Sequence, residues 1–235
     1  MLRAGWSSWR ACLLWGVATL LVSQSFALFM PATLAHPIPG SSIANPVLAF
    51  EFARTPAHLD AVFGGIGDPL RNGRIAGMMQ GNVLDYLFML VYGSFVLAFF
   101  GATARHSGNP RWWLAGWLGP LAAVSDAIEN ALLLSINADM ATPGRELAVL
   151  AYPVWIKFTA LAIACGCAAW ALARRRAWLP AALCAPPVIA IWFGIAAPYR
   201  WGENAVATIA LAWLAMLGCA GWRLWRDGRG RAPVT

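Results

Sequence analysis

The sequence predicts an all-α protein that crosses a membrane as a bundle of about six helices. Of its 235 residues, 60% are hydrophobic and only 11% are charged, whereas a soluble domain is about 25% charged. The apolar residues form runs of about 20, the length that crosses the hydrocarbon core of a bilayer. Arginines cluster at the ends of these runs, as they do in membrane proteins. We therefore expect one integral membrane domain over residues 1–235, with the lipid bilayer as its solvent.

Six apolar runs define the predicted spans. They cover residues 11–30, 75–104, 112–137, 147–173, 178–197 and 204–225. Prolines interrupt three of them, at Pro120, at Pro153 and at Pro186–Pro187. Each proline removes a backbone hydrogen bond and tends to kink its helix. Such kinks are expected to open space inside the bundle.

The first run has a second interpretation, as a cleaved signal peptide. Arg3 and Arg10 supply a positive flank, and Thr33-Leu34-Ala35 resembles a small-residue cleavage site. The apolar run is about 20 residues long, however, and a signal core is usually about 7–15. A retained anchor is therefore favoured over removal of residues 1–35.

The distribution of arginines predicts how the protein is oriented. With the N-terminus in the cytoplasm, most arginines lie on the cytoplasmic side, which is the bias that orients membrane proteins. The cytoplasmic set is Arg3, Arg10, Arg105, Arg111, Arg174, Arg175, Arg176, Arg223, Arg226, Arg229 and Arg231, and the opposite set is Arg54, Arg71, Arg74, Arg145 and Arg200. Composition rich in arginine and alanine is typical of a bacterium with a GC-rich genome. We expect a multi-pass protein of the bacterial cytoplasmic (inner) membrane with both termini in the cytoplasm.

One long connection, residues 31–74, is expected on the outer side, with two short helices at the membrane interface. Asn45-Pro46 and Thr55-Pro56 each combine a capping side chain with a proline suited to the first helical turn. Gly64-Gly65 then ends the second helix. The alternative is a loosely ordered surface loop.

Charged residues inside the spans indicate a polar site. Asp126, Glu129 and Asn130 are at i, i+3 and i+4 and share one helix face. Glu129 lies ~12 Å below the outer end of its helix, and Asp85 and Lys157, the only lysine, each lie ~15 Å below theirs. Ionisable groups near a helix centre cost about 2.5–3.5 kcal/mol each on insertion scales, so they face inward and find partners.

The simplest arrangement pairs Lys157 with Asp126 or Glu129, while Asp85 shares the site with Tyr92, seven residues further along the same face. Because carboxylates outnumber the single cation, at least one carboxyl is expected to be protonated at neutral pH and to serve as a proton acceptor or cation ligand. Glu51, in the outer loop, reaches the cavity mouth in one interpretation and is an exposed interfacial carboxylate in the favoured one. Further polar residues near the outer ends of the spans are Gln80, Asn82, Tyr199, Arg200, Glu203 and Asn204.

Several kinds of chemistry have no support in the sequence. There is no H-E-x-x-H or G-x-S-x-G motif, and His36, His58 and His106 fall in loops. The five cysteines lie within apolar runs and are interpreted as small apolar helix residues. We expect no metal and no cofactor. The net charge of +7 belongs to the ends of the spans and does not indicate nucleic-acid binding.

Three short motifs carry a resemblance: FEFARTP (50–56), LDYLF (84–88) and DAIEN (126–130). Together they resemble a group of uncharacterised bacterial multipass membrane proteins, over most of the chain from Val47 to about Ala173. The resemblance implies no activity. It implies that Glu51, Asp85, Asp126, Glu129 and Asn130 belong to one site.

Three functions remain open at this point. The leading hypothesis is outward-facing, proton-coupled binding or transport of a small solute or ion. A membrane-embedded enzyme acting on lipid or isoprenoid substrates, with a carboxyl as general acid or base, is the second. The third is a non-catalytic assembly or scaffold subunit, in which the buried charges only hold helices together. The ligand class (solute, ion or lipid) and the oligomeric state are left open.

Overall fold

The computed structural model describes residues 7–229, so that Arg3 and Arg231 of the predicted cytoplasmic set lie outside the described residues. Helices are the only regular secondary structure within the described range. Six helical segments in it are long and apolar enough to cross a membrane: Trp9–Leu28, Arg71–Ser107, Trp112–Ala138, Gly144–Ala173, Trp178–Ala196 and Pro198–Asp227. The predicted all-α, multi-pass membrane bundle is confirmed.

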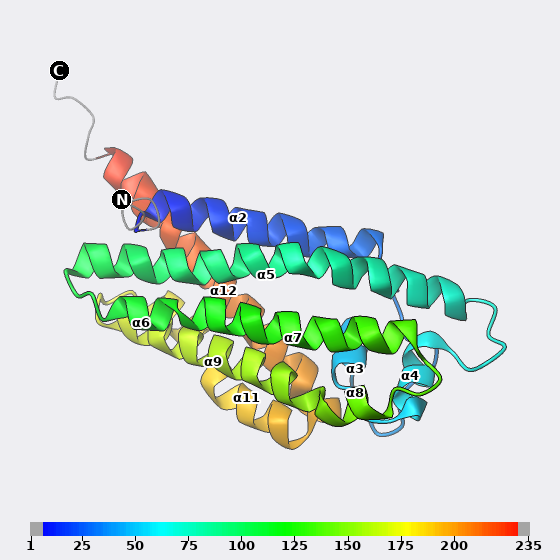
Figure 1. The fold of residues 1–235 in the computed structure, drawn as a ribbon. Coiled ribbons are helices and arrows are strands. Elements are labelled where there is room, and N and C mark those ends of the chain that lie inside the picture. The colour runs from blue at the N-terminus through cyan, green and yellow to red at the C-terminus, as the bar shows by residue number, and fades with distance from the viewer. Residues whose placement is uncertain (1–6, 230–235) are drawn as a thin grey trace.

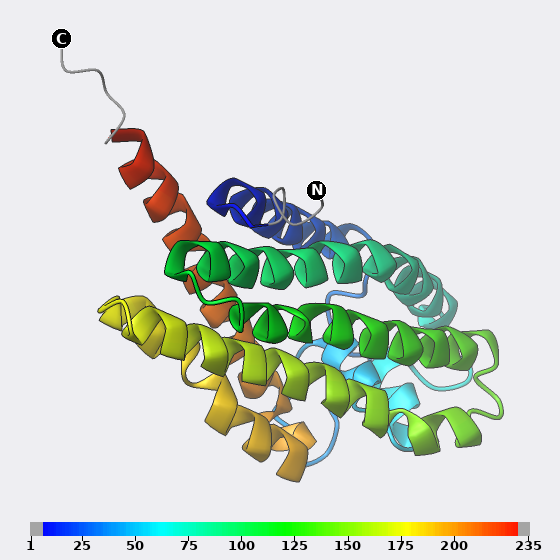
Figure 2. The same ribbon diagram turned by 60° about the vertical axis from the view of Figure 1, so that its left-hand side comes forward.

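Four of the six spans contain two helical elements each, and the other two are single helices. The elements are α2 (Trp9–Ser25) with the 3-10 turn η1 (Phe26–Leu28), α3 (Pro46–Glu51), α4 (Pro56–Phe63), α5 (Arg71–Ser107), α6 (Trp112–Gly116), α7 (Leu118–Ala138), α8 (Gly144–Val149), α9 (Ala151–Ala173), α10 (Trp178–Cys184), α11 (Pro187–Ala196) and α12 (Pro198–Arg229). Figure 1 shows α2, α5, α7, α9 and α11 side by side, with α12 crossing behind them. Because α12 packs on α11, α10, α9 and α2, it closes the bundle into a ring (Figure 2).

The prolines inside the spans lie where one helix ends and the next begins, near the start of the second helix. Pro120 lies in the first turn of α7, and Pro153 lies in the first turn of α9. Pro186 and Pro187 separate α10 from α11. Proline suits a first turn because its missing N–H has no partner there in any case. The kink expected at each proline is therefore a break between two helices.

Glycines allow the closest helix contacts in the ring. A Cβ added at Gly119 of α7 would lie 2.8 Å from the carbonyl oxygen of Gly93 in α5. One added at Gly16 of α2 would lie 2.7 Å from Leu217 Cδ1 in α12. Small residues at such crossings let backbones approach in membrane bundles. The contact of Gly16 with Leu217 is one of the places where α2 and α12 pack closely.

Residues 31–70, here called the cap segment, cover one end of the bundle, opposite the start of α2 and the end of α12 (Figure 1). Both predicted short helices are present in it. The Asn45 side chain accepts hydrogen bonds from the first turn of α3, and the Thr55 side chain does the same for α4. Gly64 ends α4 with a φ of 95°, a left-handed conformation that glycine adopts without strain.

Aromatic packing and polar contacts hold the cap segment on the bundle. Phe50, Phe52 and Phe63 are fully buried, and Phe52 stacks on Trp155 of α9 with ring centroids 5.1 Å apart. Arg71 of α5 forms an ion pair of 2.8 Å with Asp60. The 37 residues of α5 reach ~55 Å at 1.5 Å per residue, beyond the ~30 Å of a bilayer core. Its first turns therefore belong to this cap region, which is why α5 begins before the predicted residue 75.

Candidate functional site

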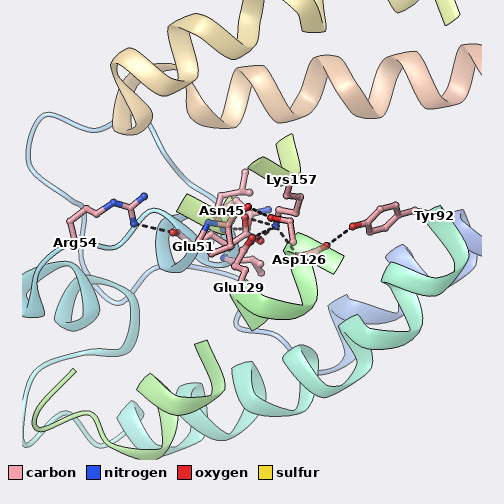
Figure 3. Close-up of polar contacts among 11 residues, drawn as sticks. Asn45, Glu51, Arg54, Tyr92, Asp126, Glu129 and Lys157 are labelled. Carbon is pink, nitrogen blue, oxygen red and sulfur yellow. Dashed lines mark hydrogen bonds and ion pairs between the residues drawn. The ribbon is translucent and has the colours of Figure 1, made fainter. Parts of the chain in front are cut away.

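Lys157 of α9 is the centre of a buried ion-pair cluster. Its ammonium nitrogen lies 3.1 Å from Asp126 Oδ1, 2.8 Å from Glu129 Oε2 and 3.3 Å from Glu51 Oε2. The Lys157 residue is 5% exposed, and Glu129 is 1% exposed. An ammonium group has three N–H donors. Lys157 donates hydrogen bonds to Asp126 and Glu129, and Glu51 adds a third ion pair. Figure 3 shows Glu51, Asp126 and Glu129 converging on Lys157.

Helix geometry brings the two α7 carboxylates to one lysine. Asp126 and Glu129 are three residues apart, so both project from the same face of α7 toward α9. Ser125 supports this face, since its hydroxyl donates a 2.8 Å hydrogen bond to the carbonyl oxygen of Pro153 in α9. One turn after Asp126, Asn130 donates to the backbone carbonyl of Asn82 in α5. Asn130 therefore joins two helices.

Tyr92 extends the cluster to α5. Its hydroxyl donates a 2.9 Å hydrogen bond to Asp126 Oδ2, as Figure 3 shows. Asp126 thus bridges a phenol and an ammonium group through its two oxygens. The sequence predicted that Asp85 and Tyr92 share a site, and both line one cavity; the bond from Tyr92 to Asp126 was not predicted.

Glu51 reaches Lys157 because α3 is anchored above the bundle. The first residues of α12 provide the anchor. Ser41 donates a 2.9 Å hydrogen bond to the carbonyl of Tyr199, and the Ala44 N–H donates a 2.8 Å bond to Glu203 Oε2. The Tyr199 hydroxyl also contacts the Phe52 carbonyl. The favoured expectation of an exposed Glu51 is wrong, since its side chain is 12% exposed and ion-paired.

Glu51 is expected to make docking of α3 depend on pH. Burial raises the pKa of Glu51 above its ordinary 4.5, against the opposing effect of Lys157. A carboxyl whose pKa rises on docking favours the docked state fully below its undocked pKa and loses that contribution as the pH rises through the docked value. Hydrogen–deuterium exchange of residues 46–51, corrected for intrinsic rates, should therefore show weaker protection at pH 8 than at pH 5.

The variant Glu51→Gln should remove most of that pH dependence, because an amide does not titrate. Asp139→Asn, at an exposed carboxylate in the connection after α7, is the control and should behave as the wild type. Equal protection at both pH values in the wild type would contradict the expectation.

A cavity of about 550 Å³ lies beside the cluster. Its polar lining includes Glu51, Asp85, Tyr92, Asp126 and Lys157. Glu129 and Asn130 do not line it. The candidate residues therefore divide into a cavity-facing group and two buried residues of α7 that support it. Among the described residues, no group of three or more His, Cys, Asp or Glu side chains is arranged to hold a metal ion.

Asp85 differs from the other carboxylates of the cavity. It is partly buried, lines the cavity and makes no hydrogen bond or ion pair with any described residue. Asn82, one turn earlier on α5, also lines the cavity and is 2% exposed. Its amide nitrogen has no hydrogen-bond partner among the described residues. These two side chains are polar groups of the cavity on α5 that the Lys157 cluster leaves unused.

Trp213 of α12 lines the same cavity and was not predicted as a site residue. Tryptophans near span ends act as interface anchors, but Trp213 lies near the middle of its span, which is the signal in the sequence that distinguishes it. Of the other polar residues noted in the sequence, Tyr199 and Glu203 anchor the cap segment, and Gln80 is exposed.

No protein-family model, no curated protein and no solved structure matches the chain. The resemblance to uncharacterised multipass membrane proteins therefore stays a prediction. Function is argued from the chemistry of the cavity and of the cluster beside it.

Proposed function

We propose that the protein binds a small solute or ion in this intramembrane cavity and couples binding to a proton held by one of its carboxyls, as a proton-coupled transporter does. The observation that carries the proposal is the excess of acids over bases. Glu51, Asp85 and Asp126 line the cavity, Glu129 lies behind it, and Lys157 is the only basic side chain in the lining. A site of this composition favours bound protons or a bound cation.

The cluster suits proton coupling because its carboxyls have different surroundings. Glu129 is buried behind the cavity and balances the charge of Lys157. Asp126 both lines the cavity and contacts Tyr92 and Lys157. A proton bound at a cavity-facing carboxyl would exchange with a cation in the cavity while the Lys157–Glu129 pair stays intact. The buried pair accounts for helix association, and the cavity-facing acids exceed what helix association requires.

The proposed location is the bacterial inner membrane with both termini in the cytoplasm, which follows from the arginine distribution. In that orientation the cap segment lies on the outer face. The cavity is then nearer to the outer side, since it is lined by Asn45, Val47, Leu48 and Glu51 of the cap segment.

A second candidate is a membrane-embedded enzyme that acts on lipid or isoprenoid substrates. One observation favours it: part of the cavity lining is exposed at mid-span, at Leu20 of α2 and Leu214 of α12. A lipid could reach the acids by that route. Mass spectrometry of lipids that copurify with the protein, and of their conversion after incubation, would support this alternative.

The proposal is tested with protein in lipid nanodiscs and a panel of inorganic cations, organic amines and neutral solutes. At least one solute should bind saturably to the wild type and release protons into a weakly buffered medium. Asp126→Asn should reduce proton release severalfold or more, because it removes one carboxylate from the cavity lining. Its single amide oxygen can still accept from Lys157, and its NH2 group can donate to the Tyr92 hydroxyl oxygen.

Asp139→Asn serves as the matched control for Asp126→Asn and should leave proton release unchanged. The proposal fails if no solute binds, or if Asp126→Asn retains binding and proton release equal to the wild type while remaining folded.

A further inference from the structure

The cavity has one wall of aromatic rings. Phe88, Tyr92 and Trp213 line it and pack on one another, with centroids 5.3 Å apart for Phe88 and Tyr92 and 5.4 Å apart for Tyr92 and Trp213. Phe26 packs on Phe88 at 5.4 Å and lines the cavity as well. Aromatic rings attract cations through their negatively charged faces, most strongly when water is excluded.

The acids of the cavity determine the sign of the charge that it accepts. Lys157 already forms ion pairs with three carboxylates within 3.3 Å, so its charge is offset and the cavity does not favour an anion. Asp85 is the carboxylate without a partner among the described residues, and it lies one turn before Phe88 on α5. A cation beside Asp85 would therefore contact a carboxylate and an aromatic ring presented by the same helix face.

Asn82 supplies an independent indication of a ligand at the same place. It is buried, lines the cavity and lies three residues before Asp85. Its amide nitrogen has no partner among the described residues. A buried amide costs free energy unless it is hydrogen-bonded. Because this nitrogen donates, an acceptor brought into the cavity, such as water or an oxygen on a substituent of the ligand, would satisfy it.

The cavity reaches the surface between α2 and α12. These helices pack closely at Gly16 and Leu217, and again at Leu13 and Gly221. From there toward the cap segment, Leu20 on α2 and Leu214 on α12 line the cavity although they are 38% and 50% exposed. Both are near the middle of their spans, at the depth of the acyl chains. A ligand that dissolves in the bilayer can enter there.

We infer that the ligand is a lipophilic organic cation, an ammonium or phosphonium with aromatic or alkyl substituents. Asp85 holds its charge, the wall of Phe88, Tyr92 and Trp213 packs on its substituents, and the bilayer supplies it between α2 and α12. The cavity volume of about 550 Å³ is within the range of about 300–1,000 Å³ typical of drug-sized ligands. This inference rests on the proposed function of the same cavity and names its substrate class.

The test uses tetraphenylphosphonium and tetraphenylborate, which have the same shape and opposite charge. Equilibrium binding of each to wild-type protein in nanodiscs is measured, with empty nanodiscs as background. The phosphonium should bind saturably, and the borate should not. Asp85→Asn should weaken phosphonium binding by about tenfold or more, the usual effect of removing a charged partner. The control Asp139→Asn should bind as the wild type does.

The outcomes separate this inference from the proposed function. Equal binding of both ions, no binding of the phosphonium, or unchanged affinity in Asp85→Asn would each overturn the inference. If another solute of the panel still bound with proton release, the proposed function would stand with a different ligand. The comparison of the two ions on wild-type protein requires no variant to fold.

Discussion

Replacing Lys157 by methionine is expected to destabilise the protein by about 3–5 kcal/mol, because it leaves buried carboxylates without their cation. Lys157 faces Asp126, Glu129 and Glu51 within 3.3 Å. Methionine has a similar length and fills much of the space. The loss of stability therefore measures the missing charge more than the missing packing. Thermal unfolding of purified protein in detergent measures the effect, which should lower the Tm by roughly 10 °C.

A second variant shows whether charge is the cause. Lys157→Met combined with Glu129→Gln removes one cation and one anion, and it should recover a substantial part of the lost stability. Arg74→Met, which removes a more exposed ion pair with Asp68 and a hydrogen bond to the Phe63 carbonyl oxygen, is the control and should cost about 1–2 kcal/mol, less than Lys157→Met. A Tm for Lys157→Met equal to that of the wild type would show that the buried pairs do not stabilise the fold.

The fold could be predicted from the sequence because the bilayer restricts the alternatives. Long apolar segments must be helical in lipid, since every backbone group needs a partner within its own segment. The ends of the spans were harder to predict. The first turns of α5 contain arginines and glycine and have no apolar signal, and ion pairs such as Arg71–Asp60 hold them in place.

The depth of the cluster in the membrane could be predicted from the sequence, but the pairing of its side chains could not. Depth along a helix follows from counting residues, so Asp126, Glu129 and Lys157 could be placed at one level. Which partner each one takes depends on how the helices are rotated about their axes. That rotation depends on packing between helices, which is why the hydrogen bond from Tyr92 to Asp126 could not be predicted.

Glu51 illustrates what local sequence does not contain. Its neighbours predict a short interfacial helix, and that helix is present. Its ion pair with Lys157 depends on contacts far along the chain, where Tyr199 and Glu203 fix the cap segment. Such long-range contacts have no periodicity by which the sequence could reveal them.

Replacing Ala210 by tryptophan is expected to slow ligand association by about tenfold or more, which corresponds to about 1.4 kcal/mol in the barrier. Ala210 lies on α12, lines the cavity and is exposed, beside the mid-span opening at Leu20 and Leu214. A large ring there narrows the route from the bilayer and touches no member of the Lys157 cluster. Stability should therefore remain close to that of the wild type.

The kinetics of tetraphenylphosphonium binding in nanodiscs measure this effect. If tryptophan obstructs only the mouth, association and dissociation slow by the same factor and the Kd is unchanged, because a barrier affects both directions equally. Ala207→Trp, at an exposed position of α12 that does not line the cavity, is the matched control and should leave both rates unchanged. Unaltered rates in Ala210→Trp, with Asp85→Asn still weakening binding, would mean that the ligand enters from the cap end, because the charge would then be recognised in the same cavity but reached by another route.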